Sequence, residues 1–167
     1  MSNAEKMLEI KDLSVIYKTD LETVYAVNGV TFSLEKGATL GLVGETGAGK
    51  TTLALTLMRL LPERTSKVTS GSITFEGEDI INLPEAQMCK IRGDKIAMIF
   101  QDPMTSLNPV LTVGEQIAEA LHVHNEAGRS KEEIDKRVDE TLTMVGIPPA
   151  RKNEYPHQFS GGMRQRV

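Results

Sequence analysis

The sequence has little of several features that would assign it to a class at once. Its 167 residues contain one cysteine, Cys89, so an internal disulfide framework is excluded. No run of apolar residues approaches the roughly 18 that a membrane-spanning helix needs, and residues 1–6 lack the apolar core of a secretory signal. The formal net charge is −4, whereas a general nucleic-acid binder usually carries a basic excess. These features together predict a reduced, cytoplasmic location.

One glycine-rich stretch, Gly44–Thr52 (Gly-Glu-Thr-Gly-Ala-Gly-Lys-Thr-Thr), carries the clearest chemical signal. It follows an apolar run, Thr39–Val43, that predicts a buried strand, and it precedes Leu53–Leu61, which predicts a buried helix. This order is that of a phosphate-binding P-loop. Glycines let backbone N–H groups turn inward around an anion, and the helix N-terminus adds a partial positive charge. Lys50 can reach the β- and γ-phosphates, and the Thr51 hydroxyl can ligate Mg²⁺.

The segments around the P-loop predict an α/β protein. Alternating apolar and polar residues predict strands over Met7–Tyr17 and Gly71–Ile80. A run rich in β-branched and aromatic residues predicts another strand over Val24–Leu34. A short helix is expected over Pro84–Arg92, and the apolar run Lys95–Phe100 predicts a buried parallel strand. We expect the first two strands to form an antiparallel sheet that leads into the P-loop strand.

Residues from about 102 to 154 predict a helical insert on this base. One helical face recurs over Val113–His124. Ser130–Glu133 has the sequence of a capping box and opens a second helix, which Gly146 should end. The expected apolar stripe of this second helix consists of Ile134, Val138, Leu142 and Val145.

The last residues, 155–167, contain a second candidate anion site. Ser160 precedes Gly161-Gly162, which is the pattern of a helix N-cap followed by two exposed backbone N–H groups. Taken alone the pattern is weak, because Ser-Gly-Gly is usually a flexible turn.

In this order the motifs resemble those of the nucleotide-binding subunit of an ATP-binding cassette (ABC) transporter. Gly44–Thr52 matches the Walker A motif, and Gln101 matches the Q-loop glutamine. Phe159–Met163 resembles the family signature, usually Leu-Ser-Gly-Gly-Gln; Phe keeps an apolar anchor, and Met is a departure seen in one branch. Tyr17 resembles the aromatic residue that stacks on adenine. Tyr25 is the competing candidate, and strand packing is the alternative for either ring.

The resemblance implies a branch and a set of roles. Residues 101–109 and 155–166 are similar to segments typical of dipeptide, oligopeptide and nickel importers. In this family Lys50 and the P-loop amides hold the phosphates, while Thr51 and Gln101 complete Mg²⁺ coordination. The signature contacts the γ-phosphate of ATP bound to the opposite subunit of a head-to-tail dimer. The residues expected to contact ATP or its Mg²⁺ are Tyr17, Gly44, Glu45, Thr46, Gly47, Ala48, Gly49, Lys50, Thr51, Thr52, Gln101, Ser160, Gly161 and Gly162.

The same resemblance implies partners and a place in the cell. Asp102–Pro109 would lie near the groove that receives a coupling helix from a transmembrane permease subunit. A second nucleotide-binding subunit would complete the dimer, an extracellular solute-binding protein would act indirectly, and no nucleic acid is expected. The protein would be peripheral to the membrane, on its cytoplasmic face.

Some catalytic groups of the family have no match in this sequence. These are the Walker B aspartate, the catalytic glutamate and a later histidine; we interpret His122, His124 and His157 as surface residues. The predicted fold is a P-loop NTPase, truncated before the Walker B strand, with an antiparallel β subdomain and P-loop core over 1–101, a helical subdomain over 102–154 and the signature over 155–167. We predict an N-terminal fragment that binds ATP but does not hydrolyse it alone, and whose sheet edges stay uncovered unless something else covers them.

Three other functions fit part of the sequence. An ABC-type ATPase acting on DNA usually has a long coiled coil where this chain has a compact insert, and the acidic net charge gives it no support. A small P-loop kinase or GTPase would have no need of the Gln101 loop and the Ser160 turn. A nucleotide-binding module with only regulatory or structural use is hard to separate from the preferred function for this chain alone.

Overall fold

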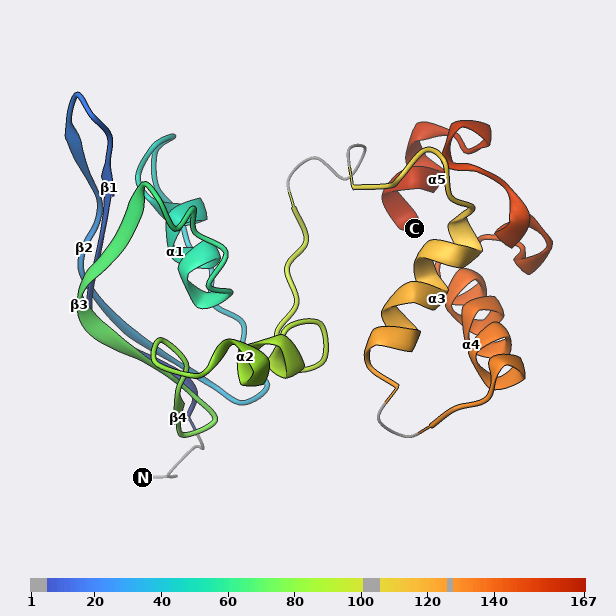
Figure 1. The fold of residues 1–167 in the computed structure, drawn as a ribbon, viewed down its shortest axis with the longest axis horizontal. Coiled ribbons are helices and arrows are strands. Elements are labelled where there is room, and N and C mark those ends of the chain that lie inside the picture. The colour runs from blue at the N-terminus through green and yellow to red at the C-terminus, as the bar shows by residue number, and fades with distance from the viewer. Residues whose placement is uncertain (1–5, 101–105, 126–127) are drawn as a thin grey trace. The chain divides into compact units, whose positions relative to one another are not determined.

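The computed structural model describes residues 6–100, 106–125 and 128–167. The chain divides into two compact units, Met1–Arg92 and Gly93–Val167, whose elements Figure 1 shows along the chain. The predicted subdivision at residues 101 and 154 stays a prediction.

The first unit is built on a four-stranded antiparallel sheet with the order β2-β1-β3-β4. Ile10 lies at its centre, opposite Phe32 on one neighbouring strand and Ile73 on the other, and both isoleucines are fully buried. The two early strands are therefore confirmed. The third begins earlier than predicted, at Ser66, because Val68 pairs with β1, and it ends earlier, at Phe75, before the turn into β4. The strands are β1 (Lys6–Lys18), β2 (Thr23–Glu35), β3 (Ser66–Phe75) and β4 (Glu78–Asp79).

Two helices, α1 (Lys50–Leu57) and α2 (Glu85–Ile91), lie on the same side of this sheet (Figure 1). Leu53 of α1 and Met88 of α2 are buried in the core of the unit. The helix α1 ends sooner than predicted, because Arg59 takes a left-handed conformation with φ 50°. A backbone hydrogen bond of 2.9 Å from the Leu60 N–H to the carbonyl of Leu55 closes this end.

The expectation of buried strands at Thr39–Val43 and Lys95–Phe100 is wrong for the described structure. Neither segment is a strand, apart from an isolated bridge at Ile96. Val43 is 92% exposed and Ile99 is 94% exposed. A central parallel strand needs hydrogen-bonding neighbours and helices over both faces, and none of the described strands β1–β4 pairs with either segment. An apolar run alone therefore does not make a strand here.

An acidic side chain on β1 lies between two lysines. Glu9 is 2.5 Å from the ammonium of Lys11 and 2.6 Å from that of Lys6. These two cations, Lys11 first, lower the pKa of Glu9 from its usual 4.5 to about 2. The carboxylate therefore stays ionised well into acid.

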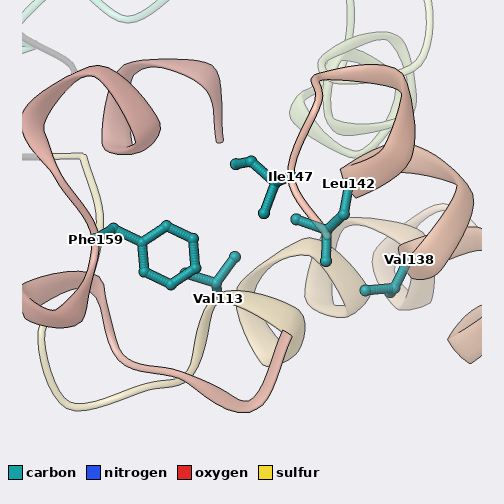
Figure 2. Packing of buried hydrophobic residues seen from close by; sticks show 5 residues of the cluster. All are labelled: Val113, Val138, Leu142, Ile147 and Phe159. Atoms are coloured by element: carbon teal, nitrogen blue, oxygen red, sulfur yellow. The ribbon is translucent and has the colours of Figure 1, made fainter. Parts of the chain in front are cut away.

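The second unit is helical and has its own core. Five buried residues pack together in it (Figure 2): Val113, Val138, Leu142, Ile147 and Phe159. Its elements are α3 (Val113–Val123), α4 (Lys131–Met144), the short 3-10 helices η2 (Pro149–Asn153) and η3 (Pro156–Gln158), and α5 (Gly161–Arg166).

Local signals set the bounds of these helices. The Ser130 hydroxyl accepts a hydrogen bond from the Glu133 N–H, and the Glu133 carboxylate accepts one from the Ser130 N–H, so the predicted capping box is confirmed. Thr112 and Glu115 make a second capping box before α3, which the sequence analysis missed. Gly146, with φ 69°, follows the C-terminus of α4 as predicted.

Candidate functional site

The glycine-rich loop joins its lysine to the start of α1. Lys50 is the first residue of the helix, and Gly49, with φ 84°, is its N-cap and supplies no side chain to the helix amides. The first-turn N–H groups of α1 are thus left without a side-chain cap, which is the condition for binding an anion there.

The Lys50 ammonium holds the loop closed on itself. Its Nζ donates hydrogen bonds of 2.6 Å to the carbonyls of Gly44 and of Glu45. An ammonium has three N–H donors, so among the described residues these two contacts leave one donor for a ligand oxygen. The lysine is therefore placed at the mouth of the loop before any ligand is bound.

Gly49 also fixes the loop against the sheet. A Cβ at this position would lie 2.1 Å from the carbonyl oxygen of Ala26 on β2, so the loop backbone touches the strand directly. Gly47, with φ 85°, needs its left-handed conformation but has open space around it. The two glycines therefore meet different requirements of one turn.

The residues beside Lys50 differ in exposure. Thr51 is exposed on the first turn of α1, where its hydroxyl is open to a ligand. Thr52 is buried, and its hydroxyl lies 3.4 Å from the phenolic oxygen of Tyr17 on β1. Tyr25, on β2, is 69% exposed. The structure thus brings Tyr17 against the P-loop helix and leaves the Tyr25 ring on the surface.

The second motif lies in the second unit. Ser160 is the N-cap of α5, as predicted, and its hydroxyl accepts a hydrogen bond of 3.3 Å from the Met163 N–H. Gly161 and Gly162 have no positive φ, and a Cβ on either would meet nothing within 4 Å. Nothing in the described part of the chain therefore requires glycine at these two positions.

Two predicted regions lie partly or wholly outside the described residues. Gln101 and residues 102–105 are among those not described. Within the described remainder of this loop, the amide of Gln116 on α3 pairs with Asn108, accepting from its N–H at 2.8 Å and donating to its carbonyl at 3.1 Å.

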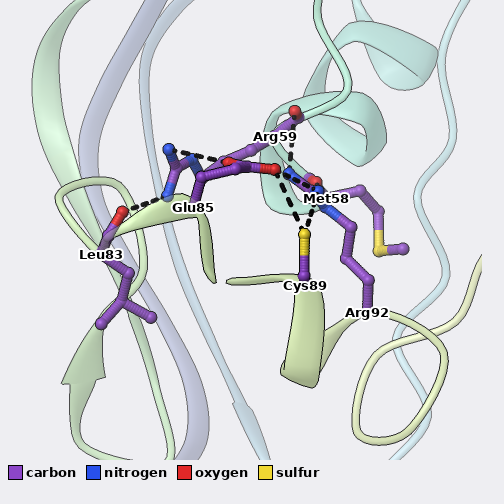
Figure 3. A network of polar contacts seen from close by, with 6 residues as sticks. All are labelled: Met58, Arg59, Leu83, Glu85, Cys89 and Arg92. Carbon is purple, nitrogen blue, oxygen red and sulfur yellow. Dashed lines mark hydrogen bonds and ion pairs between the residues drawn. The ribbon is translucent and has the colours of Figure 1, made fainter. Parts of the chain in front are cut away.

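Two arginines that the sequence motifs do not indicate contact the segments next to these motifs. In the first unit, Arg92 donates to the carbonyl of Met58, at the end of α1, at 2.7 Å and to the Glu85 carboxylate at 2.6 Å (Figure 3). Arg59 also contacts Glu85, and the hydrogen bond with Arg92 is the largest cause of the lowered pKa of Glu85. In the second unit Arg151 contacts the signature. In the sequence, the sign of this contact is the spacing of Arg151 and Glu154, which lie three residues apart and form an ion pair.

No group of three or more histidine, cysteine or carboxylate side chains that could hold a metal occurs among the residues the structure describes. In the same part of the chain, no helix is long and apolar enough to cross a membrane.

Comparison with known proteins decides the family. The sequence profile of the ABC transporter family matches residues 27–167. The chain belongs to the ABC transporter family. Membership implies nucleotide binding.

The ABC transporter relatives are peptide transport proteins. The chain is 48% identical over 169 residues to the oligopeptide transport ATP-binding protein OppD of Bacillus subtilis, covering 100% of this chain and 47% of that protein. It is 50% identical over 165 residues to the dipeptide transport ATP-binding protein DppD of the same organism, covering 98% and 49%. The chain thus spans about half the length of the curated relatives it matches.

Solved ABC transporter cassettes share the fold. Two structures of one cassette match with a TM-score of 0.81 and 31% identity, over 96% of this chain and 66% of theirs. One is described as a dimeric bacterial ABC transporter cassette, and the other as a dimeric post-hydrolysis state bound to ADP and Pi. The fold class expected from the sequence, a P-loop NTPase of the ABC type, is confirmed.

Proposed function

We propose that this chain is the ATP-binding part of a subunit that energises an ABC importer of peptides. The observation that carries the proposal is the placement of Lys50 at the uncapped N-terminus of α1, with its ammonium held across the loop carbonyls. The names of the relatives support peptides as the transported class. Nickel, the other solute class suggested by the motifs, has no such support among these relatives.

The proposed roles follow the positions of the residues. The P-loop amides and Lys50 bind the β- and γ-phosphates, and Tyr17, whose ring lies against α1, stacks on the adenine. The exposed Thr51 hydroxyl fits a ligand of Mg²⁺, which would arrive with the nucleotide phosphates, and Gln101 would complete its coordination. The cation would neutralise phosphate charge.

The signature is proposed to serve a second subunit. Because the packing of the described residues requires neither Gly161 nor Gly162, we infer that their lack of a side chain makes room for a group from outside. In a head-to-tail dimer that group is the γ-phosphate of ATP on the opposite subunit, with Ser160 beside it. Permease subunits near residues 102–109 and a place on the cytoplasmic face of the membrane complete the proposal.

Nucleotide titration tests the proposal. Lys50→Ala should weaken binding of a fluorescent ATP analogue by at least about tenfold, since a charge-assisted contact to phosphate contributes roughly 1.5–3 kcal/mol. Lys67→Ala, which removes an exposed lysine of β3, should leave binding unchanged. Equal binding by wild type and the Lys50 variant would refute the assignment of the P-loop.

A phosphate-release assay tests the prediction that this chain does not hydrolyse ATP alone. We expect no turnover from the 167-residue chain alone, because phosphoryl transfer needs a group that orients the attacking water. Turnover that Lys50→Ala abolishes would show that the chain carries a catalytic base that we have not identified. A gel shift with duplex DNA separates the DNA-acting alternative, for which we expect no salt-sensitive retention.

A further inference from the structure

One arginine touches both ends of the signature segment, Phe159–Met163. Arg151, in η2, donates a hydrogen bond of 3.0 Å from Nη2 to the carbonyl of Gln158, the residue before the segment. Its guanidinium carbon lies 4.6 Å from the centre of the Phe159 ring. Its Nη1 lies 3.1 Å from the sulfur of Met163. A single planar group therefore contacts the backbone before the segment and the side chains at its start and end.

This guanidinium is itself fixed to the core of the second unit. Its Nε and Nη2 donate to the same carboxylate oxygen of Glu154, at 2.9 and 2.6 Å. This pairing raises the pKa of Arg151 and lowers that of Glu154. The backbone carbonyl of Glu154 accepts the N–H of Val113 at 3.0 Å, and Val113 is fully buried beside Phe159 (Figure 2). The position of Arg151 is thus set by the start of α3.

A second arginine holds the other end of the same stretch. The Nη1 of Arg166, the last residue of α5, donates to the carbonyls of Val145 and Gly146 at 2.8 and 3.0 Å. Between the two arginines, Ser160 and both glycines are exposed. The exposed part of the signature is therefore short, and it is fixed on each side by a guanidinium.

We propose that Arg151 is a positioning residue that holds the signature segment in the conformation presented to the partner's nucleotide. This inference rests on the proposed function. Arg151 is not among the residues proposed to contact ATP, and it acts through Phe159 and the Gln158 carbonyl. Its loss should let the exposed stretch move while leaving the P-loop of the same chain unaffected, so its effect is on turnover and not on the first binding of ATP.

The test uses the complete transporter that contains this sequence, reconstituted in lipid, and measures kcat and KM for ATP together with binding of a fluorescent ATP analogue without Mg²⁺. Arg151→Ala should lower kcat about ten- to hundredfold, the range for a misplacement of about 1 Å, with analogue affinity unchanged. Arg151→Lys should recover part of this loss, because lysine keeps the charge but not the planar fork. Glu154→Gln weakens the ion pair that fixes the guanidinium but keeps the guanidinium itself. It should also lower kcat, but by less than Arg151→Ala does.

The matched control is Arg137→Ala. Arg137 also pairs with a glutamate three residues later, Glu140, at 3.0 Å, but on the exposed surface of α4. Among the described residues it makes no hydrogen bond or ion pair with the signature. This variant should have wild-type kcat. If Arg151→Ala fails to fold, the kcat of Glu154→Gln decides whether Arg151 positions the signature.

Two results would overturn the inference while leaving the proposed function intact. One is a kcat for Arg151→Ala and Glu154→Gln within about twofold of wild type. The other is a parallel loss of analogue binding and thermal stability, which a merely structural arginine would give. Failure of the proposed function looks different, because the wild-type protein itself would then bind no ATP analogue or would bind it equally well after Lys50→Ala.

Discussion

Adding one methyl group to single glycines of the P-loop separates two reasons for which a loop needs glycine. At Gly49 both reasons apply, because φ is 84° and the new Cβ would lie 2.1 Å from the carbonyl oxygen of Ala26. A left-handed conformation costs a residue with a Cβ roughly 1–2 kcal/mol. Forcing extra volume into a packed site costs roughly 1–3 kcal/mol more. Gly49→Ala should therefore lower the free energy of unfolding by about 2–5 kcal/mol.

The neighbouring glycines isolate each contribution. Gly47→Ala meets open space at φ 85°, so only the conformational cost of about 1–2 kcal/mol should appear. Gly77→Ala, in the turn between β3 and β4 with φ 87° and open space, is the control for that cost away from the loop. Gly44→Ala has no positive φ and an ordinary contact of 3.4 Å to the Ala48 Cβ, so it should stay within about 0.5 kcal/mol of wild type.

Urea denaturation gives the free energies of unfolding, and hydrogen exchange of the β2 segment shows where the damage lies. Gly49→Ala should speed exchange in β2 around Ala26, and Gly47→Ala should not. The reasoning fails if Gly49→Ala is no less stable than Gly47→Ala, since the contact with β2 would then carry no cost.

Three further outcomes follow from the structure. The lowered pKa of Glu9 gives stability that is present above pH 4.5 and is lost as the pH falls toward about 2. Glu9→Gln should therefore flatten the dependence of the free energy of unfolding on pH over this range. Urea midpoints that change with pH equally steeply in wild type and variant would contradict this. Arg92→Met removes the guanidinium that donates to the Met58 carbonyl, at the end of α1, at 2.7 Å. Urea denaturation should show a free energy of unfolding lowered by about 1–3 kcal/mol. An unchanged free energy of unfolding would show that water replaces the guanidinium. Leu142→Ala, at a fully buried position of α4, should lower the free energy of unfolding by about 2–5 kcal/mol, measured by thermal melts. The control is Met144→Ala, at a residue that is 78% exposed. It should change the free energy of unfolding by less than about 0.5 kcal/mol.

The parts of the fold that sequence analysis predicted correctly are those decided by neighbouring residues. The capping box at Ser130, the stop at Gly146 and the buried stripe of α4 each depend on residues within a turn or two of one another. Three of the four predicted stripe residues are buried in α4, whereas Val145 is the C-cap and is only partly buried. The alternation that predicted β1 works for the same reason, because a strand with one buried face shows it every second residue.

The parts that sequence analysis missed depend on residues far apart in the chain. The apolar run Thr39–Val43 has the composition of a strand but no partner among the described strands, so its side chains are exposed. The extension of β3 back to Ser66 needs β1 beside it, although its own residues are mostly polar. The P-loop motif identified Lys50 but not its contacts with the loop carbonyls. The signature motif identified Ser160 but not Arg151, which contacts Phe159 and Met163 on either side of it.

The glycines of the two motifs separate positions where folding needs glycine from positions where ligand binding needs it. Gly49 is needed by the chain itself, since any Cβ there meets the backbone of β2. Gly161 has an ordinary φ and open surroundings, so Gly161→Ala should leave the melting temperature of the chain unchanged. In the complete transporter the same change should lower ATP turnover, because the methyl group would occupy the space proposed for the partner's γ-phosphate. Unchanged turnover would mean that no group approaches this glycine closely, and the proposed role of the signature would then be wrong even if Lys50 binds ATP as expected.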